Sequence, residues 1–138
     1  MSTRCTLHFG YGDKPAAIIY RHSDGYPDGV LPDLERFFAD VEAQTKDTRF
    51  DDPTYLAAKF VVWQANDYVV AARKYPWRKG ETVHMLDFLS VGVMLRDPGD
   101  IEYRYLINCG QHDAKERPTI TVVDLHAAAA PAAQEGAR

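Results

Sequence analysis

The chain has 138 residues, 46% of them hydrophobic and 12% aromatic, and a chain of this size and composition buries one hydrophobic core. Its 16 Lys and Arg against 20 Asp and Glu give a formal net charge of -4, which argues against direct nucleic-acid binding, because phosphates attract clustered positive charge. The N-terminus lacks the apolar stretch of a secretory signal, and no segment reaches the ~18 apolar residues that cross a bilayer. We therefore expect one domain over residues 1–126, in the cytoplasm and without a membrane partner.

The first 44 residues predict a β-hairpin followed by a helix. Cys5, Leu7 and Phe9 alternate with polar residues, which is typical of a strand with one buried face. Residues 10–15 supply turn chemistry and residues 16–22 predict the returning strand. Apolar residues at helical spacing then predict a surface helix over 33–44, namely Leu34, Phe37, Phe38 and Val41.

The second half predicts one long helix and three strands. Asp52 and Pro53 form a good helix start, because Asp caps free amides and Pro tolerates the first helical position. The helix over 53–74 is apolar around most of its circumference, which predicts burial by more than one neighbour. Extended segments over 85–96, 100–109 and 119–125 predict an antiparallel meander. The Ala- and Pro-rich residues 127–138 predict a disordered tail.

The element order is therefore ββααβββ, which predicts an α+β fold with a mainly antiparallel sheet and two helices packed on one face. The other face of the sheet is expected to be free. Alternation along the strands places four basic side chains there as a candidate binding surface, namely Arg4, His8, Arg21 and Arg104.

The cysteines Cys5 and Cys109 both lie in apolar, strand-like runs. A reducing compartment keeps such thiols free, so we expect two buried thiols. A disulfide would need neighbouring strands with a Cα separation under about 7 Å, and the sequence leaves the distance between the two residues open.

The segment from Tyr20 to Val30, YRHSDGYPDGV, gathers ionisable and aromatic residues between the hairpin and the first helix. One interpretation is a demanding turn, in which carboxylates accept backbone amides while Gly25 and Gly29 supply positive φ. The other is a ligand site, in which an imidazole beside a carboxylate acts as general base and arginines clamp an anion. This small-ligand or hydrolase alternative uses Arg21, His22, Asp24, Tyr26, Asp28 and Arg104.

Catalytic and cofactor signatures are otherwise missing from the sequence. Asp24 and Asp28 do not fit the spacing of an EF-hand loop, and the remaining histidines show no ligand spacing, so we predict no metal. The sequence has no nucleophile elbow around Ser23, no dinucleotide fingerprint and no Walker motif. We expect no cofactor and favour a binding protein over an enzyme.

Charge is unevenly distributed along the chain. Residues 28–52 hold eight acidic and three basic residues, a net charge of -5, which predicts an acidic surface for a basic partner. Residues 73–79 place four cations around two aromatics, which suits phosphates, a helix C-terminus or the acidic segment of a second copy in a homodimer. The residues predicted to bind a partner are Asp28, Asp33, Glu35, Asp40 and Glu42.

The opening Ser2-Thr3-Arg4 and the run from Tyr20 to Pro27, YRHSDGYP, resemble a group of small uncharacterised proteins of phages, prophages and plasmids. The resemblance covers mainly the first forty residues and implies an origin in a mobile element, with no activity attached. Small acidic phage proteins without catalytic signatures resemble inhibitors of bacterial defence, including anti-CRISPR proteins. The hypothesis is thus an inhibitor whose acidic helix and YRHSDGYPDG loop occupy a basic channel on a host protein or protein–nucleic-acid complex.

Overall fold

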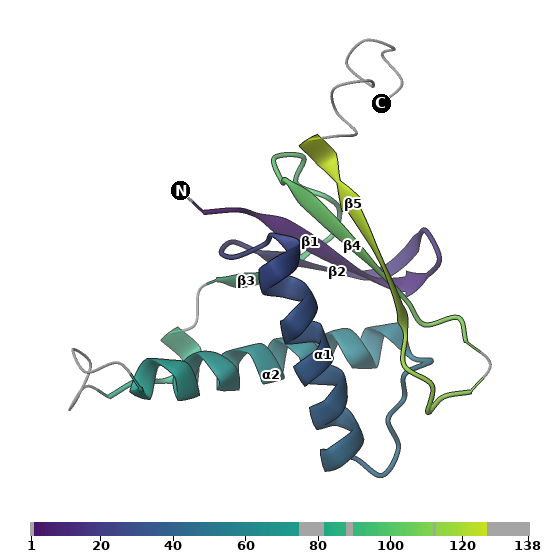
Figure 1. Ribbon diagram of the computed structural model, residues 1–138, viewed down its shortest axis with the longest axis horizontal. Coiled ribbons are helices and arrows are strands. Elements are labelled where there is room, and N and C mark those ends of the chain that lie inside the picture. The colour runs from purple at the N-terminus through teal and green to yellow at the C-terminus, as the bar shows by residue number, and fades with distance from the viewer. Residues whose placement is uncertain (1, 75–81, 88–89, 112, 127–138) are drawn as a thin grey trace.

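The computed structural model describes residues 2–74, 82–87, 90–111 and 113–126. Over these residues a five-stranded sheet carries two long helices on one face, and Figure 1 shows the helices crossing each other below the sheet. The predicted α+β class is confirmed. The tail predicted over 127–138 and most of the basic segment over 73–79 lie outside the described residues.

The elements follow the predicted order. The first half holds β1 (Cys5–Tyr11), β2 (Lys14–Arg21), α1 (Pro27–Gln44) and α2 (Pro53–Arg73). The second half holds the short 3-10 helix η2 (Met85–Asp87), β3 (Val91–Met94), β4 (Tyr103–Asn108) and β5 (Thr119–Asp124). The strands lie in the order β3-β2-β1-β4-β5, and three of the four pairings are antiparallel.

The predicted meander of the last three strands is wrong. β3 pairs with β2, whereas β4 pairs with β1 and runs parallel to it. Residues 95–102 connect β3 to β4 and carry the chain from one side of the hairpin to the other, so the turn at Pro98 and Gly99 does not join neighbouring strands. β1 is the central strand of the sheet, and its residues Cys5, Leu7 and Phe9 are fully buried.

Helix α1 begins six residues earlier than predicted. Pro27 occupies its first turn, where a missing amide hydrogen leaves no bond unmade, and Asp28 stands there as a favourable charge for the helix dipole. The buried stripe extends back to Val30. Helix α2 begins as predicted, with the Asp52 carboxylate accepting a hydrogen bond from the Tyr55 amide.

The core fills the space between the helices and the sheet with aromatic side chains. Phe37 of α1 meets Phe60 of α2 edge-on at a ring-centroid distance of 5.3 Å, and Phe9 of β1 lies 5.9 Å from Phe60. These contacts with α1 and β1 confirm the prediction that more than one neighbour buries α2, but two of its apolar residues, Val62 and Val70, are 65% and 42% exposed. No helix in the described ranges is both long and apolar enough to cross a membrane.

Candidate functional site

The YRHSDGYPDG loop is tied to the sheet through Gly25. The amide of Gly25 donates to the Thr3 carbonyl at 2.9 Å, and the buried Tyr105 hydroxyl donates to the Gly25 carbonyl at 2.7 Å. A Cβ on Gly25 would lie 2.8 Å from the Thr3 oxygen, so this position needs glycine for close approach. The positive φ predicted at Gly25 and Gly29 lies instead at Asp24, with φ of 54°.

The side chains predicted to form a ligand pocket point to different places. Arg21 faces Cys5 across the hairpin and lies on the helix side of the sheet, 7% exposed, so its predicted place on the free face is wrong. Arg104 pairs with Thr6 in the register and lies on the opposite side. The sheet therefore separates the two arginines of the predicted anion clamp.

The rest of the predicted pocket is spread over the loop. His22 shares a hydrogen bond with the Tyr20 hydroxyl at 2.7 Å, whereas Asp24 accepts from the Tyr26 hydroxyl at 3.2 Å. Asp28 is exposed in the first turn of α1. His22 and Asp24 thus have separate partners, and the structure does not assemble them as a base and its orienting carboxylate.

The second face of the sheet is partly covered by the connection from β3 to β4. Its Asp97 contacts His8 Nε2 at 2.9 Å, accepts from the Thr6 hydroxyl at 2.9 Å and pairs with Arg104. Thr6 and His8 are buried, so the prediction that β1 has one buried face is wrong. Burial acts to raise the pKa of Asp97, but the hydrogen bonds from His8 and Thr6 outweigh it and lower the pKa.

This cluster resembles a catalytic triad in composition but not in geometry. In a nucleophilic relay the hydroxyl and the carboxylate contact opposite nitrogens of the imidazole. Here Thr6 and Asp97 both contact Nε2 of His8, and the Thr6 side chain is inaccessible to a substrate. The cluster fastens the connection to the sheet.

Asp33 of the predicted partner surface is instead part of an internal charge network. Asp33 accepts from Arg21 at 2.8 Å and from Arg36 at 2.7 Å. Arg21 also donates to Gln64 of α2 at 3.1 Å, and Arg36 pairs with Asp67 of α2 at 2.9 Å. Strand β2 and both helices are thereby joined through charges, which leaves Asp33 little capacity for a partner.

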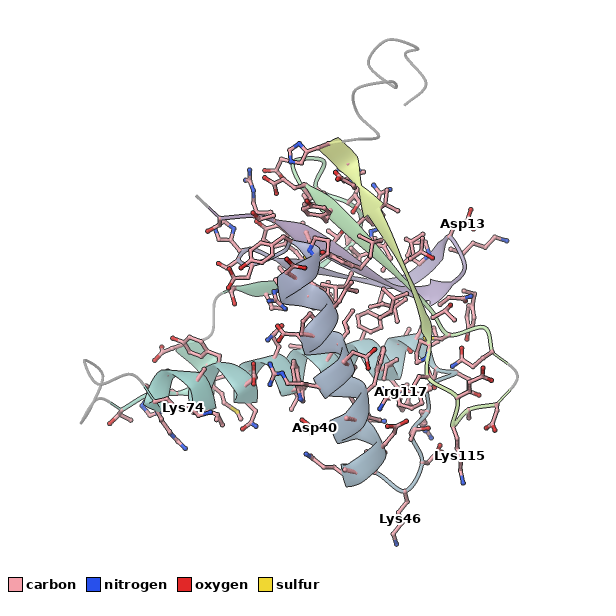
Figure 2. All side chains as sticks on the ribbon, viewed as in Figure 1. Asp13, Asp40, Lys46, Lys74, Lys115 and Arg117 are labelled. Carbon is pink, nitrogen blue, oxygen red and sulfur yellow. The ribbon has the colours of Figure 1, made fainter. Side chains whose placement is uncertain are left out.

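Three further acidic residues of α1, Glu35, Asp40 and Glu42, are also engaged. Arg117 pairs with Glu35 at 3.0 Å and with Glu42 at 2.6 Å, and Figure 2 shows Arg117 between α1 and the connection that leads into β5. Asp40 lies on the other side of α1, where it accepts from the indole nitrogen of Trp63 at 2.7 Å. The acidic helix face is thus largely neutralised within the molecule.

A groove of about 610 Å³ lies in the angle between the second half of α1 and the middle of α2. Trp63 forms part of its wall and is held in place by Asp40 and by the Arg36 guanidinium, which stacks 5.0 Å from the ring centroid. Met85 of η2 also lines the groove, and the next residue, Leu86, is 95% exposed. The lining residues are Phe37, Asp40, Val41, Gln44, Thr45, Ala58, Lys59, Val62, Trp63, Asn66 and Met85.

Sequence reasoning named Asp40 for this region but missed the groove. The signal was present in α2, whose apolar residues surround the helix although one long helix partner and one sheet cannot cover every side of it. Val62 is one of these apolar residues, and it faces outward, 65% exposed. An apolar residue at a position that no neighbour covers indicates a binding surface as well as a core.

The two thiols lie near opposite ends of β1. Cys5 is in the first position of β1, whereas the Cys109 amide donates to the carbonyl of Gly10 at the far end. Both are free and buried, and burial raises the pKa of each to about 12. Neither thiol is poised as a nucleophile.

No group of three or more His, Cys, Asp or Glu side chains that could hold a metal ion is found among the described residues. No protein-family model, no curated protein and no solved structure matches the chain.

Proposed function

We propose that this chain works by binding a host protein, and that the groove between α1 and α2 receives the apolar face of an amphipathic helix of that partner. The observation that carries the proposal is the exposed apolar lining of the groove, where Val62 is 65% and Met85 44% exposed. Large exposed apolar surfaces with a polar rim are typical of interaction sites. Trp and Met are residue types that anchor such contacts.

The shape and the chemistry of the groove favour a helix as the occupant. Two crossing helices form a trough whose floor is apolar and whose rim carries Asp40, Gln44, Lys59 and Asn66, and helix-in-groove recognition uses this arrangement. The rim offers one acidic and one basic side chain, so a partner helix with a Lys or Arg near Asp40 and a Glu or Asp near Lys59 would be complementary.

A macromolecule suits the surface better than a small molecule. The volume of the groove lies in the range of small-ligand pockets, about 300–1,000 Å³, but Leu86, which follows the lining residue Met85, adds an exposed apolar side chain outside it. The small-ligand or hydrolase alternative has less support, because His22 and Asp24 hydrogen-bond to separate tyrosines and Arg21 and Arg104 lie on opposite sides of the sheet.

The resemblance of the first forty residues to phage, prophage and plasmid proteins supports a bacterial host as the source of the partner. An inhibitor of a defence complex stays a hypothesis that rests on that resemblance. The docking surface is thus the apolar groove and not the acidic face expected from charge alone. Asp33, Glu35 and Glu42 already pair with arginines of the same molecule, so they are less available to a partner.

The test is recovery of a host protein from a bacterial lysate by the tagged wild-type chain and by two matched variants. Val62→Asp puts a charge into the groove, and Val93→Asp puts the same charge on β3, where Val93 is 74% exposed and outside the groove. We expect a stoichiometric partner with the wild type and with Val93→Asp, and its loss with Val62→Asp. Equal recovery with all three proteins would show that the groove does not bind it.

A further inference from the structure

Within the described residues, the second edge of the sheet, formed by β5, carries no bulge, no proline and no charge before Asp124. Among the residues that the structure describes, β5 pairs with β4 alone, and Figure 1 shows it along the outer side of the sheet. Edge strands are usually blunted by shortness, bulges, proline or charges. The other edge strand, β3, is only four residues long and contains Gly92.

The composition of β5 favours pairing. Its first five residues, TITVV, are all β-branched and uncharged, and β-branched residues are those that strands prefer. The strand pairs with β4 in continuous register from Thr119 to Asp124, without a bulge. A regular, uncharged edge of this kind is a template for a further strand.

We propose that β5 pairs antiparallel with β5 of a second copy of this chain, about a twofold axis at Thr121 that is perpendicular to the sheet. The two sheets would then continue into one, with the helices of both copies on the same side. A symmetric interface uses the same patch twice, so each residue must suit its counterpart. In this register Thr121 faces Thr121, Ile120 faces Val122, and Thr119 faces Val123 of the second copy.

The neighbouring register centred on Val122 fits less well. Residues that lie opposite each other in an antiparallel pair must point to the same face of the sheet. The twofold axis can therefore move only from one residue position to the next, and one such neighbouring register has its axis at Val122. That register would place the Asp124 carboxylate opposite Ile120, an unfavourable pair in a sheet. With the center at Thr121, Asp124 lies opposite Pro118, and the two Asp124 carboxylates stand six positions, or roughly 20 Å, apart along the strand.

The neighbours of β5 are consistent with this register. Pro118 precedes the strand and has no amide hydrogen to donate, so the new ladder would end where proline and aspartate meet. Val122 is 37% exposed at the helix side of the edge, and pairing with Ile120 of the second copy would cover it. A second copy of β5 would therefore extend the ladder of backbone hydrogen bonds and cover the exposed Val122.

The experiment is sedimentation equilibrium of the full chain over a range of concentrations up to about 1 mM, because pairing through one strand makes a small, weak interface. We expect dimers for the wild type and for Val93→Lys on the opposite edge. Thr121→Lys and Thr121→Asp each place like charges face to face and should be monomeric, whereas an equal mixture of the two should dimerise. A monomeric wild type, or dimers that Thr121→Lys leaves unchanged, would overturn the proposal.

Crosslinking tests the register with a matched pair of variants. Directly opposite residues of antiparallel strands have Cα atoms about 4.5–5.5 Å apart, within disulfide range, so Thr121→Cys should oxidise to a covalent dimer. Val123→Cys lies on the same face, but its two copies would be four positions, or about 13 Å, apart and should not crosslink. The native thiols do not compete, because both are buried. Crosslinking of Val123→Cys in place of Thr121→Cys would exclude the register.

Discussion

Replacement of Asp33 by Asn separates the two interpretations of the acidic helix, because it leaves the buried Arg21 without its countercharge. Asp33 is 17% and Arg21 9% exposed at the side chain, and their charged atoms lie 2.8 Å apart. Removal of one partner of a buried pair costs about 3–5 kcal/mol. Arg21 keeps its hydrogen bonds to the Ser23 carbonyl and to Gln64, so we expect a loss of about 2–3 kcal/mol in the free energy of unfolding.

The assay is urea unfolding followed by circular dichroism. With a denaturant slope of about 1–3 kcal/mol per molar urea, the expected loss moves the midpoint down by roughly 0.7–3 M. The matched control is Glu35→Gln on the same helix as Asp33. It removes an exposed ion pair with Arg117 and should lower the free energy of unfolding by less than about 1 kcal/mol. Equal, small shifts for the two variants would refute the view that Asp33 is a structural residue, and would return it to the list of residues available to a partner.

Three further predictions concern the loop, the second face and the thiols. Gly25→Ala should lose about 1–3 kcal/mol of stability in thermal unfolding, because its Cβ meets the Thr3 carbonyl, whereas Asp24→Gly at φ 54° should lose little. The pKa of Asp97 is lowered on folding, so the contribution of Asp97 to the free energy of unfolding is present at neutral pH and lost as the pH falls below about 4. The acid unfolding curve of Asp97→Asn should lack this loss of stability, and an unchanged curve would contradict the role assigned to Asp97. The pKa of Cys5 and Cys109 is raised from 9.0 to about 12, so stability should fall as the pH rises above 9, and a thiol reagent at pH 8 should label both only after unfolding.

Local signals in the sequence predicted the elements that depend on local chemistry. The start of α2 follows from Asp52 and Pro53, which act through a cap and a preset φ within one turn of helix. The hairpin of β1 and β2 follows from alternation and a turn, and its strands pair antiparallel from Cys5 with Arg21 to Tyr11 with Lys14. Neither inference needs knowledge of a distant residue.

Two wrong predictions, the meander and the outward Arg21, have one cause: each depends on contacts between residues far apart in the sequence. The parallel contact of β1 with β4 joins Cys5 to Tyr103, and nothing in either strand's composition distinguishes that partner from a neighbour in a meander. Alternation along the strand predicted an outward Arg21, yet Arg21 is buried, with its countercharge 12 residues away in Asp33 and its amide partner 43 residues away in Gln64. A buried charge is predictable only once its partner is known.

Internal pairing of the acidic residues also shapes the candidate site. Asp40 and Arg36 fix Trp63 by a hydrogen bond and by stacking, so this wall of the groove is ordered before a partner arrives, and less side-chain freedom is lost on binding. The charges that the sequence suggested for docking thus act as supports for an apolar surface. Binding to such a surface depends on the burial of apolar area rather than on attraction across solvent.

Salt distinguishes these two modes of binding. At about 1 M ionic strength the Debye length falls to roughly 3 Å, which suppresses attraction between exposed charges. A partner held by the groove should stay bound to the wild-type chain when salt in a pull-down is raised from about 0.1 M to about 1 M, whereas one held by the acidic face should be released. Lys59→Ala, at the rim of the groove, serves as the control for charge, since loss of one rim cation should change the salt dependence only slightly. Release of the partner by salt alone would place the binding energy back in the carboxylates of α1, and would require the pairs with Arg117 to open when the partner binds.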